Sequence, residues 1–154
     1  GCRSPVRHAR GPGYRLSKIH HIGIVVSDLP EALSSLGLTS DDVRETVYDP
    51  VQKNKLHFVY ISANDLWLEF VEPTSEEAST WTFARKFGAG LHHLGFWTED
   101  MDVSEGLHAD RSGTFILGRY QIDVSSFGGA IRTFFVSAKG LIVEYVTSRG
   151  SLSK

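Results

Sequence analysis

Apolar and polar residues alternate along the first half of the chain in a pattern that predicts one strand, one helix and three further strands. The β-rich run at 18–26 is followed by Pro30, which suits the first turn of a helix, with Ser27 or Asp28 as its cap and Gly37 as its end. Turn residues then separate three strand-like runs: RETVYD at 44–49, KLHFVYIS at 55–62 and DLWLEFVEP at 65–73. The first half is therefore expected to form a β-α-β-β-β unit.

The second half of the chain repeats this order. HHIGIVVSDL at 20–29 has its counterpart in HHLGFWTEDM at 92–101, and LWLEFV at 66–71 has its counterpart in LIVEYV at 141–146. A repeat of this length indicates two copies of one structural unit. The expected elements are a strand over 91–98, a helix around 102–110, and strands over 114–123, 130–138 and 141–147.

A short helix is expected between the two copies. Thr74 and Glu77 have the spacing of a capping box, and the apolar residues Trp81 and Ala84 continue at helical intervals until Gly88. We therefore predict an α+β fold in which two βαβββ modules form a single domain. The predicted boundaries are a flexible basic arm at 1–17, a domain at 18–147 with modules 18–73 and 90–147 joined by a linker helix at 74–89, and a tail at 148–154.

Two histidines and two glutamates occupy equivalent positions of the two copies. They are His21 and Glu69 in the first copy, and His93 and Glu144 in the second. Each glutamate lies in the middle of an apolar strand, where burying a carboxylate costs free energy unless it is paired or bound to a metal ion. Imidazole nitrogens and carboxylate oxygens are ligands of Zn, Ni, Co, Mn and Fe(II). The repeat therefore predicts one shared divalent metal site with open positions for substrate oxygens, as Lewis-acid catalysis requires.

Strand alternation assigns the neighbouring residues to faces. His20 and His92 are expected to point away from the metal site and to be structural. Trp67 and Trp97 each share a face with a predicted ligand, so they could wall a substrate pocket, although packing in the core would explain them as well. Arg132 could bind a substrate carboxylate or phosphate in a bidentate manner, or form an ion pair at the surface.

Composition narrows the class of function. With a net charge of −2 and a pI near 6.4, the chain shows no sign of nucleic-acid binding. No apolar stretch reaches the roughly 20 residues that span a bilayer, so no membrane partner is expected. The single cysteine, Cys2, excludes an internal disulfide and is typical of a reducing compartment. These features predict a cytoplasmic protein whose partner is a small-molecule substrate.

Four stretches of the sequence resemble a known family: KIHHIGIVVSDL, LEFVEPTSE, GAGLHHLGFWTEDM and GGAIRTFFVSAKGLIVEY. With them the chain resembles the vicinal oxygen chelate superfamily, the glyoxalase I and bleomycin resistance fold, over nearly all of 18–147. Within it, the chain is most similar to methylmalonyl-CoA epimerases. The resemblance implies a cupped, mostly antiparallel sheet around a central metal site, with His21, Glu69, His93 and Glu144 as ligands. Members of the superfamily are frequently dimers, which implies a homodimer.

The resemblance also implies an epimerase-like isomerase that uses enolate chemistry on a small acyl thioester, such as an acyl-CoA, or on an α-oxo acid. A divalent cofactor of the Co, Ni, Zn, Mn or Fe type would stabilise the enolate, and Glu144 would take part in proton transfer. Epimerases of this kind carry a glutamate base in the third strand, where the nearest residue here is His57. His57 could act as acid or base, or it could be an ordinary residue of the rim.

Other interpretations stay open. The same His-Glu-His-Glu set is that of the bacterial-type glyoxalase I, a lyase. A ring-cleaving dioxygenase of the superfamily typically uses two His and one Glu, so Glu69 counts against it without excluding it. A non-catalytic module could bind a small toxic molecule without metal, but it would not need buried carboxylates in both copies. Basic residues could guide the phosphates of a coenzyme A handle or form a solvated rim: Lys53, Lys55, Arg85 and Lys86.

Overall fold

Each half of the chain folds in the order strand, helix, three strands. The computed structural model describes residues 18–109 and 111–148, and the predicted arm at 1–17 and the predicted tail beyond Ser148 lie outside the described residues. The elements are β1 (Ile19–Val25), α1 (Leu29–Ser35), β2 (Val43–Asp49), β3 (Asn54–Ile61), β4 (Leu66–Pro73), α2 (Trp81–Phe87), β5 (Gly90–Trp97), α3 (Met101–Ala109), β6 (Thr114–Val124), β7 (Gly129–Ala138) and β8 (Leu141–Ser148). Short 3-10 helices lie at Ser40–Asp42, Ser62–Asn64 and Ser125–Phe127, the last of which is η3.

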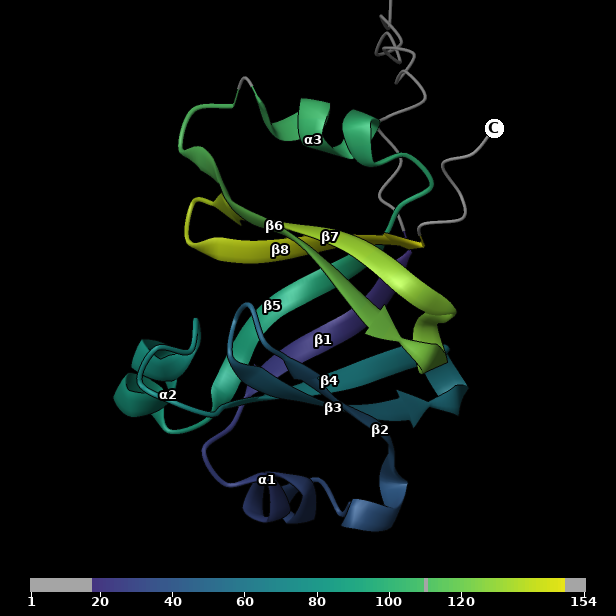
Figure 1. Cartoon of the computed structure of the whole chain (residues 1–154), viewed down its shortest axis with the longest axis vertical. Coiled ribbons are helices and arrows are strands. Elements are labelled where there is room, and N and C mark those ends of the chain that lie inside the picture. The colour runs from purple at the N-terminus through teal and green to yellow at the C-terminus, as the bar shows by residue number, and fades with distance from the viewer. Residues whose placement is uncertain (1–17, 110, 149–154) are drawn as a thin grey trace, which may run out of the picture.

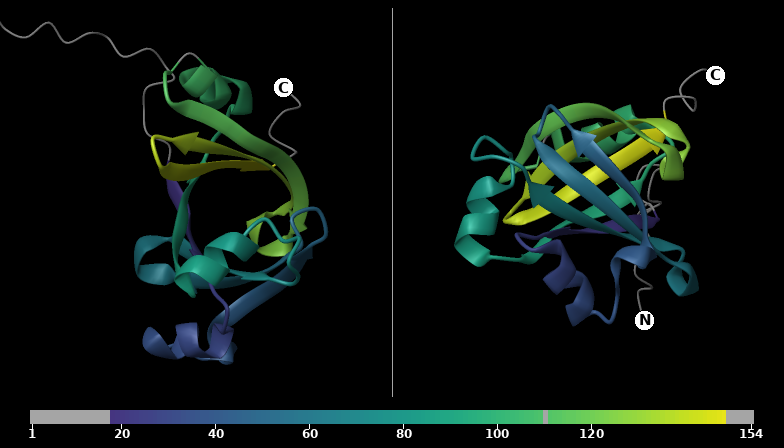
Figure 2. Two further views of the ribbon diagram at one scale, coloured as in Figure 1. Left: turned by 90° about the vertical axis from the view of Figure 1, so that its left-hand side faces the viewer. Right: turned by 60° about the horizontal axis from the view of Figure 1, so that its bottom comes forward.

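The strands form one curled eight-stranded sheet with the order β2-β3-β4-β1-β5-β8-β7-β6. Neighbouring strands are antiparallel except for β1 with β4 and β5 with β8, which run parallel. The two modules meet where β1 pairs with β5, in the middle of the sheet (Figure 1). The left view of Figure 2 shows the sheet curling around a common interior, with α1 and α3 at opposite ends of the molecule. The predicted α+β fold of two βαβββ modules with a cupped, mostly antiparallel sheet is confirmed.

Helix α1 begins as its sequence predicts. The side chain of Asp28 accepts a hydrogen bond from the backbone N–H of Glu31 at 3.1 Å, and Pro30 lies in the first turn. Of the two candidate caps, Asp28 is therefore the one used. Leu33 of α1 is buried in one cluster with Val59 and Phe70 of the sheet and with Val26, which follows β1. No helix in the described part of the chain is long and apolar enough to cross a membrane.

The linker helix is shorter than predicted, and the prediction that it begins at Thr74 is wrong. Helix α2 begins only at Trp81. The backbone N–H and the hydroxyl of Thr74 both donate to the carbonyl of Lys53, at 3.1 and 2.7 Å, and the N–H of Ser79 donates to the carbonyl of Gln52 at 2.9 Å. These bonds tie the segment to the turn between β2 and β3. The N–H of Ser79 is therefore not available to the carbonyl of Ser75, as a helix that begins at Thr74 would require.

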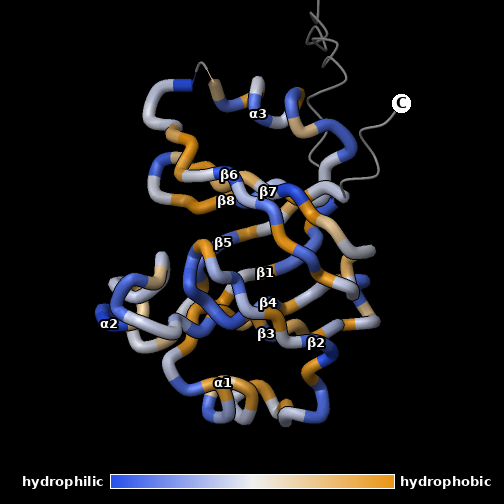
Figure 3. Tube along the Cα trace, in the orientation of Figure 1, coloured by the Kyte–Doolittle hydropathy of each residue, from blue (hydrophilic) through white to orange (hydrophobic). Residues whose placement is uncertain are grey.

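The interior of the cup contains contacts between the two modules. Hydrophobic and hydrophilic positions alternate along the strands in Figure 3, as expected for a sheet whose two faces differ in environment. One apolar cluster joins Phe58 of the first module to Val124, Ile131 and Val146 of the second. The two modules therefore share a core on the concave face, and the candidate site lies beside it.

Candidate metal centre

The pairing of four strands brings together the four predicted ligands. In the register between β1 and β5, His21 lies opposite Gly95 and His93 lies opposite Gly23. The parallel neighbours add one glutamate on each side, since Gly23 pairs with Glu69 of β4 and Gly95 pairs with Glu144 of β8. The four side chains thus come from four adjacent strands in the middle of the sheet.

Glycine is required opposite each histidine. A Cβ atom built on Gly23 would lie 2.1 Å from the ring of His93, and one built on Gly95 would lie 2.1 Å from the ring of His21. Each imidazole therefore lies directly over the backbone of the facing strand. This close approach gives a physical reason for the H-x-G spacing of both copies.

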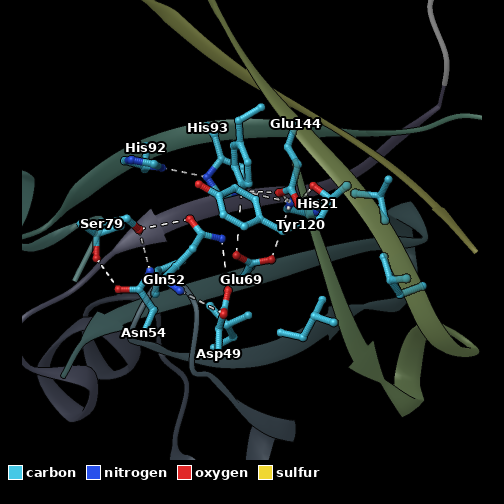
Figure 4. Close-up of a pocket in the computed structure, with 18 of the residues that line it drawn as sticks. His21, Asp49, Gln52, Asn54, Glu69, Ser79, His92, His93, Tyr120 and Glu144 are labelled. Carbon is cyan, nitrogen blue, oxygen red and sulfur yellow. Dashed lines mark hydrogen bonds and ion pairs between the residues drawn. The ribbon is translucent and has the colours of Figure 1, made fainter. Parts of the chain in front are cut away.

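The ligand atoms converge at one point inside the sheet (Figure 4). The Nε2 atoms of His21 and His93 are 3.0 Å apart, and Glu144 Oε2 lies 2.8 Å from the first and 3.0 Å from the second. Glu69 approaches from the other side, with carboxylate oxygens 3.6 Å from His21 Nε2 and 3.9 Å from His93 Nε2. One donor atom from each of the four residues lies within 4.8 Å of all the others, and all four residues are buried.

Burial and the charges of the neighbouring ligands shift the pKa values of three of the four residues. Burial opposes ionisation of Glu144, but the charges and hydrogen bonds of His21 and His93 outweigh it and hold the pKa of Glu144 well below its usual range. Burial raises the pKa of Glu69, and the charge of Glu144 raises it further, against the opposing charge of His21. Burial lowers the pKa of His21, but the charges of Glu144 and Glu69 outweigh it and leave that pKa raised.

This donor set fits a divalent metal ion. Two imidazole nitrogens and two carboxylates match the ligand preferences of Zn, Co, Ni, Mn and Fe(II). Two buried carboxylates side by side repel each other unless positive charge lies between them. The hydroxyl of Thr133 donates to Glu144 Oε1 at 2.6 Å, which leaves Glu144 Oε2 directed at the two histidines. A side chain that orients a ligand carboxylate in this way is typical of metal sites.

His20 and His92 do not point away from the site, and the prediction that they would is wrong. The pairing of β1 with β5 passes over one residue on each strand, His20 on the first and His92 on the second. Such an extra residue is a β-bulge, which interrupts the alternation of faces. His20 Nδ1 lies 3.0 Å from His21 Nδ1, and His92 Nδ1 lies 2.9 Å from His93 Nδ1. Burial and the charge of the adjacent histidine lower the pKa of both His20 and His92 to about 4.

A cavity of about 290 Å³ opens beside the four ligands. One wall is apolar and is formed mainly by strands of the second module: Ile122, Val124, Ile131, Phe135 and Val146. Tyr120 also lines the cavity, and its ring centroid lies 5.9 Å from that of Phe135. The facing wall is polar and comes from the end of β2, the turn that follows it, the start of β3 and the residues just before α2: Asp49, Gln52, Asn54, Ser79 and Thr80.

The polar wall is held by a continuous series of hydrogen bonds. The Thr80 hydroxyl donates to Asn54 Oδ1 at 2.7 Å, and Asn54 Nδ2 donates to Ser79 Oγ at 3.0 Å. Ser79 Oγ donates to Gln52 Oε1 at 3.1 Å, and Gln52 Nε2 donates to Asp49 Oδ2 at 3.1 Å. Asp49 Oδ1 also accepts two backbone N–H groups of the following turn. The series ends on a carboxylate that is 5% exposed and lines the cavity.

Sequence reasoning missed this wall. DPVQKN at 49–54 has the composition of an ordinary exposed turn, and nothing local distinguishes an aspartate that faces solvent from one that faces a cavity. Asp49 lines a cavity whose other walls include residues far along the chain, such as Ile131 and Glu144.

His57 lies outside the cavity. Its neighbours Leu56 and Phe58 line the cavity, so alternation directs the ring of His57 to the outer face of the sheet. There, His57 Nδ1 lies 2.9 Å from Thr46 Oγ1, and His57 Nε2 lies 3.7 Å from Glu72 Oε1. Burial lowers the pKa of His57, against the opposing charge of Glu72. The structure does not bring His57 together with the four ligands.

The three predicted substrate-binding residues also lie away from the cavity lining. Trp67 packs against Phe58 and Phe127, with ring centroids 6.4 and 5.4 Å apart, and so belongs to the core. Trp97 packs on the ring of His20 at 5.5 Å. Arg132 lines a separate pocket beside α3 on the outer face of β7, because its neighbours Ile131 and Thr133 face inward. We therefore find no contact of these three side chains with the cavity.

Comparison with protein families and with other sequences gives two matches. The model of the glyoxalase/bleomycin resistance protein/dioxygenase superfamily matches residues 20–123. The uncharacterized protein YqjC of Bacillus subtilis (strain 168) is 29% identical over 85 residues. The matched stretch covers 53% of this chain and 57% of that protein. The match therefore spans little more than half the length of that relative.

Several solved structures have a similar fold. A variant of the Streptomyces coelicolor methylmalonyl-CoA epimerase, in complex with 2-nitronate-propionyl-CoA, is 28% identical with a TM-score of 0.68, over 88% of this chain and 99% of that chain. A methylmalonyl-CoA epimerase in complex with methylmalonyl-CoA and NH4+ is 28% identical with a TM-score of 0.70, over 91% of this chain and 100% of that chain. The epimerase of Mycobacterium tuberculosis is 18% identical with a TM-score of 0.69, over 86% and 89% of the two chains, and shares the fold.

Proposed function

Because the chain belongs to the glyoxalase/bleomycin resistance protein/dioxygenase superfamily, we propose that it is a metal-dependent, epimerase-like isomerase that uses enolate chemistry on an acyl-CoA thioester or an α-oxo acid. The observation that carries the proposal is the buried group of two histidines and two glutamates beside a cavity. The likeness to epimerases that bind acyl-CoA ligands supports the substrate class.

His21, Glu69, His93 and Glu144 would hold the metal ion. A divalent ion of the Co, Ni, Zn, Mn or Fe type supplies positive charge that stabilises negative charge on a substrate oxygen. Thr133 holds one oxygen of Glu144, and the bulged histidines contact the rings of His21 and His93. These contacts keep the ligands in place while the substrate binds and leaves.

A proton acceptor in the cavity is needed in addition to the ligands, and Asp49 is the residue that suits this role. Asp49 lines the same cavity as Glu69 and Glu144 but is not part of the ligand group. In Figure 4, Asp49 and Glu144 lie on opposite sides of Glu69. An epimerase needs a proton donor or acceptor on each face of a planar intermediate. We assign Asp49 to one face, in the role that His57 would have had, and Glu144 to the other.

The walls of the cavity favour a substrate with an apolar acyl group. The second module contributes isoleucine, valine and phenylalanine side chains, which suit an alkyl chain. Among the described residues that line the cavity there is no lysine or arginine. The phosphates of a coenzyme A handle would therefore lie outside it, where basic residues of the β2–β3 segment and α2 could guide them: Lys53, Lys55, Arg85 and Lys86.

The test is hydrogen exchange at the carbon next to the thioester carbonyl. The metal-loaded protein, incubated with methylmalonyl-CoA and other acyl-CoA thioesters in deuterated water, is expected to exchange this proton, and Asp49→Asn is expected to slow the exchange by about 100-fold or more. His21→Ala and Glu144→Ala should bind less metal and lose exchange, whereas His57→Ala should keep both. A wild-type protein that binds no divalent ion, or that binds one and exchanges none of these substrates, would contradict the proposal.

A glyoxalase I-like lyase is the second candidate, because the four-ligand set is the one that the sequence shares with that activity. The same metal-loaded protein, given methylglyoxal and a thiol, separates the two functions. Formation of a hydroxyacyl thioester without exchange of acyl-CoA protons would favour the lyase.

A further inference from the structure

Two histidines that are not metal ligands take up equivalent positions behind the two that are. His20 and His92 are the extra residues of two bulges, one on each strand of the β1–β5 pair. Each bulge places an imidazole beside the ligand histidine that follows it in sequence, with Nδ1–Nδ1 distances of 3.0 and 2.9 Å. Because the same arrangement occurs in both copies, the two contacts form one pattern rather than two coincidences.

The geometry of the ligands sets the direction of these hydrogen bonds. His21 and His93 direct their Nε2 atoms to the centre of the site, where those atoms face each other and Glu144. A neutral imidazole that uses the lone pair of Nε2 carries its proton on Nδ1. With a metal ion on Nε2, the Nδ1–H of each ligand histidine would therefore donate, and the Nδ1 of His20 or His92 would accept.

Both accepting rings are held by their surroundings. The ring of His20 lies between Trp97 and Phe127, with centroid distances of 5.5 and 4.4 Å. The ring of His92 packs edge-on against Phe83 of α2 at 5.2 Å. Fixed rings of this kind restrict the rotation of the ligand that donates to them.

We propose that His20 and His92 are positioning residues, which hold the imidazoles of His21 and His93 in the tautomer and orientation that a metal ion needs. Residues that accept the second N–H of a ligand histidine usually are carboxylates, backbone carbonyls or water. Here the acceptor is a second imidazole, which carries no negative charge. Since Glu69 and Glu144 would already bind the ion directly, a neutral acceptor would avoid a further reduction of its positive charge. The inference rests on the metal site of the proposed function but not on the identity of the substrate.

Paired substitutions test the acceptor separately from the shape of the ring. Asparagine keeps an oxygen near the position of Nδ1, whereas phenylalanine keeps the ring without an acceptor. The probe is Co²⁺, followed by its visible absorption spectrum and by competition with a chelator. His20→Phe and His92→Phe are expected to bind Co²⁺ about 10–100-fold more weakly and with an altered spectrum, while His20→Asn and His92→Asn stay within a few-fold of the wild type.

The control is His57→Phe, which removes another buried histidine that does not line the cavity and should leave Co²⁺ binding unchanged. Thermal unfolding of the metal-free variants checks that the phenylalanine and asparagine substitutions are equally folded. Equal Co²⁺ affinity and equal spectra for the phenylalanine and asparagine variants would overturn the inference. A wild-type protein that binds no Co²⁺ would overturn this inference together with the metal site, whereas Co²⁺ binding without proton exchange would overturn only the proposed reaction.

A measurement on the wild type keeps the inference testable if a phenylalanine variant does not fold. Nitrogen NMR of the Zn²⁺-loaded protein reports which ring nitrogen of each histidine is protonated. The expected result is protonated Nδ1 in His21 and His93, and protonated Nε2 in His20 and His92. A proton on Nδ1 of His20 and His92 would contradict the proposed direction of the hydrogen bonds.

Discussion

At the scale of single residues, two glycines decide whether the four ligands can meet. Gly23 and Gly95 each lie beneath the imidazole of the facing strand, so close that a Cβ atom would lie 2.1 Å from the ring. Neither position has a positive φ, so the requirement comes from space and not from backbone strain. The glycine and the histidine of each H-x-G motif therefore act on opposite strands: each glycine makes room for the histidine of the other copy.

Replacing either glycine by alanine is expected to displace the facing imidazole and to abolish metal binding. Gly23→Ala and Gly95→Ala should also lower the free energy of unfolding by about 1–3 kcal/mol, because the added methyl group overpacks a buried site. Metal content and denaturant-induced unfolding measure the two effects. Gly106→Ala in α3 is the matched control, since nothing lies within 4 Å of its Cβ position. A Gly95→Ala protein with the metal content of the wild type would contradict the expectation.

At the scale of elements, a contact between β2 and η3 joins the two ends of the sheet. β2 and β6 are the edge strands, and η3 follows β6. The carboxylate of Glu45 in β2 accepts the backbone N–H groups of Ser125 and Ser126, at 3.0 and 2.7 Å. The contact holds η3 where Phe127 lines the cavity and packs on Phe58, with ring centroids 4.8 Å apart. The carboxylate of Glu45 thus links β2 of the first module to η3 of the second.

The contribution of Glu45 to stability should depend on pH. Burial opposes its ionisation, but the hydrogen bonds from Ser126 and Ser125 together outweigh it and lower the pKa of Glu45 below its ordinary value of 4.5. A lowered folded pKa means that the stabilisation is present above the unfolded pKa and is lost as pH falls through the folded one. Glu45→Gln should therefore lower the free energy of unfolding at pH 7 and have less effect at about pH 3, in denaturant-induced unfolding.

The matched control for this substitution is Glu76→Gln, which removes an exposed carboxylate without a role in the sheet. Its effect should be the same at both pH values. If Glu45→Gln has the same free energy of unfolding as the wild type at pH 7, or if its effect does not change with pH, the contact between β2 and η3 does not stabilise the fold.

At the scale of the whole molecule, the candidate metal site belongs to both modules of one chain. His21 and Glu69 come from the first module, and His93 and Glu144 from the second. An ion bound there would connect the modules directly, so binding should stabilise the folded chain as a unit. The predicted homodimer and cytoplasmic location stay predictions.

Removal of the metal is expected to destabilise the protein. A ligand that binds only the folded state stabilises it by about 2.7 kcal/mol when its free concentration is 100 times Kd. A chelator should therefore lower the free energy of unfolding of the wild type by an amount of this order, and titration should give one ion per chain. The same chelator should leave His21→Ala unchanged. A wild type that is equally stable with and without chelator would show that no ion binds at the four residues.

The sequence by itself was enough to predict the module order, most strand positions and the four residues of the candidate site. His21, Glu69, His93 and Glu144 stand out because a repeat places them at equivalent positions, and because a carboxylate inside an apolar strand needs a partner. Both arguments need only the sequence. The assignment of these side chains to one face holds because successive side chains of a strand alternate between faces wherever the pairing is regular.

Only the tertiary structure decided which further residues surround these four. The bulges at His20 and His92 arise from the pairing of β1 with β5, and a register between strands that are distant in sequence leaves no local signal. Asp49 faces the cavity, and helix formation at Thr74 is prevented, through contacts with residues elsewhere in the chain. His57 faces outward because its neighbours on β3 face in. Local patterns identified the candidate ligands, whereas long-range pairing determined which groups support them and which line the cavity.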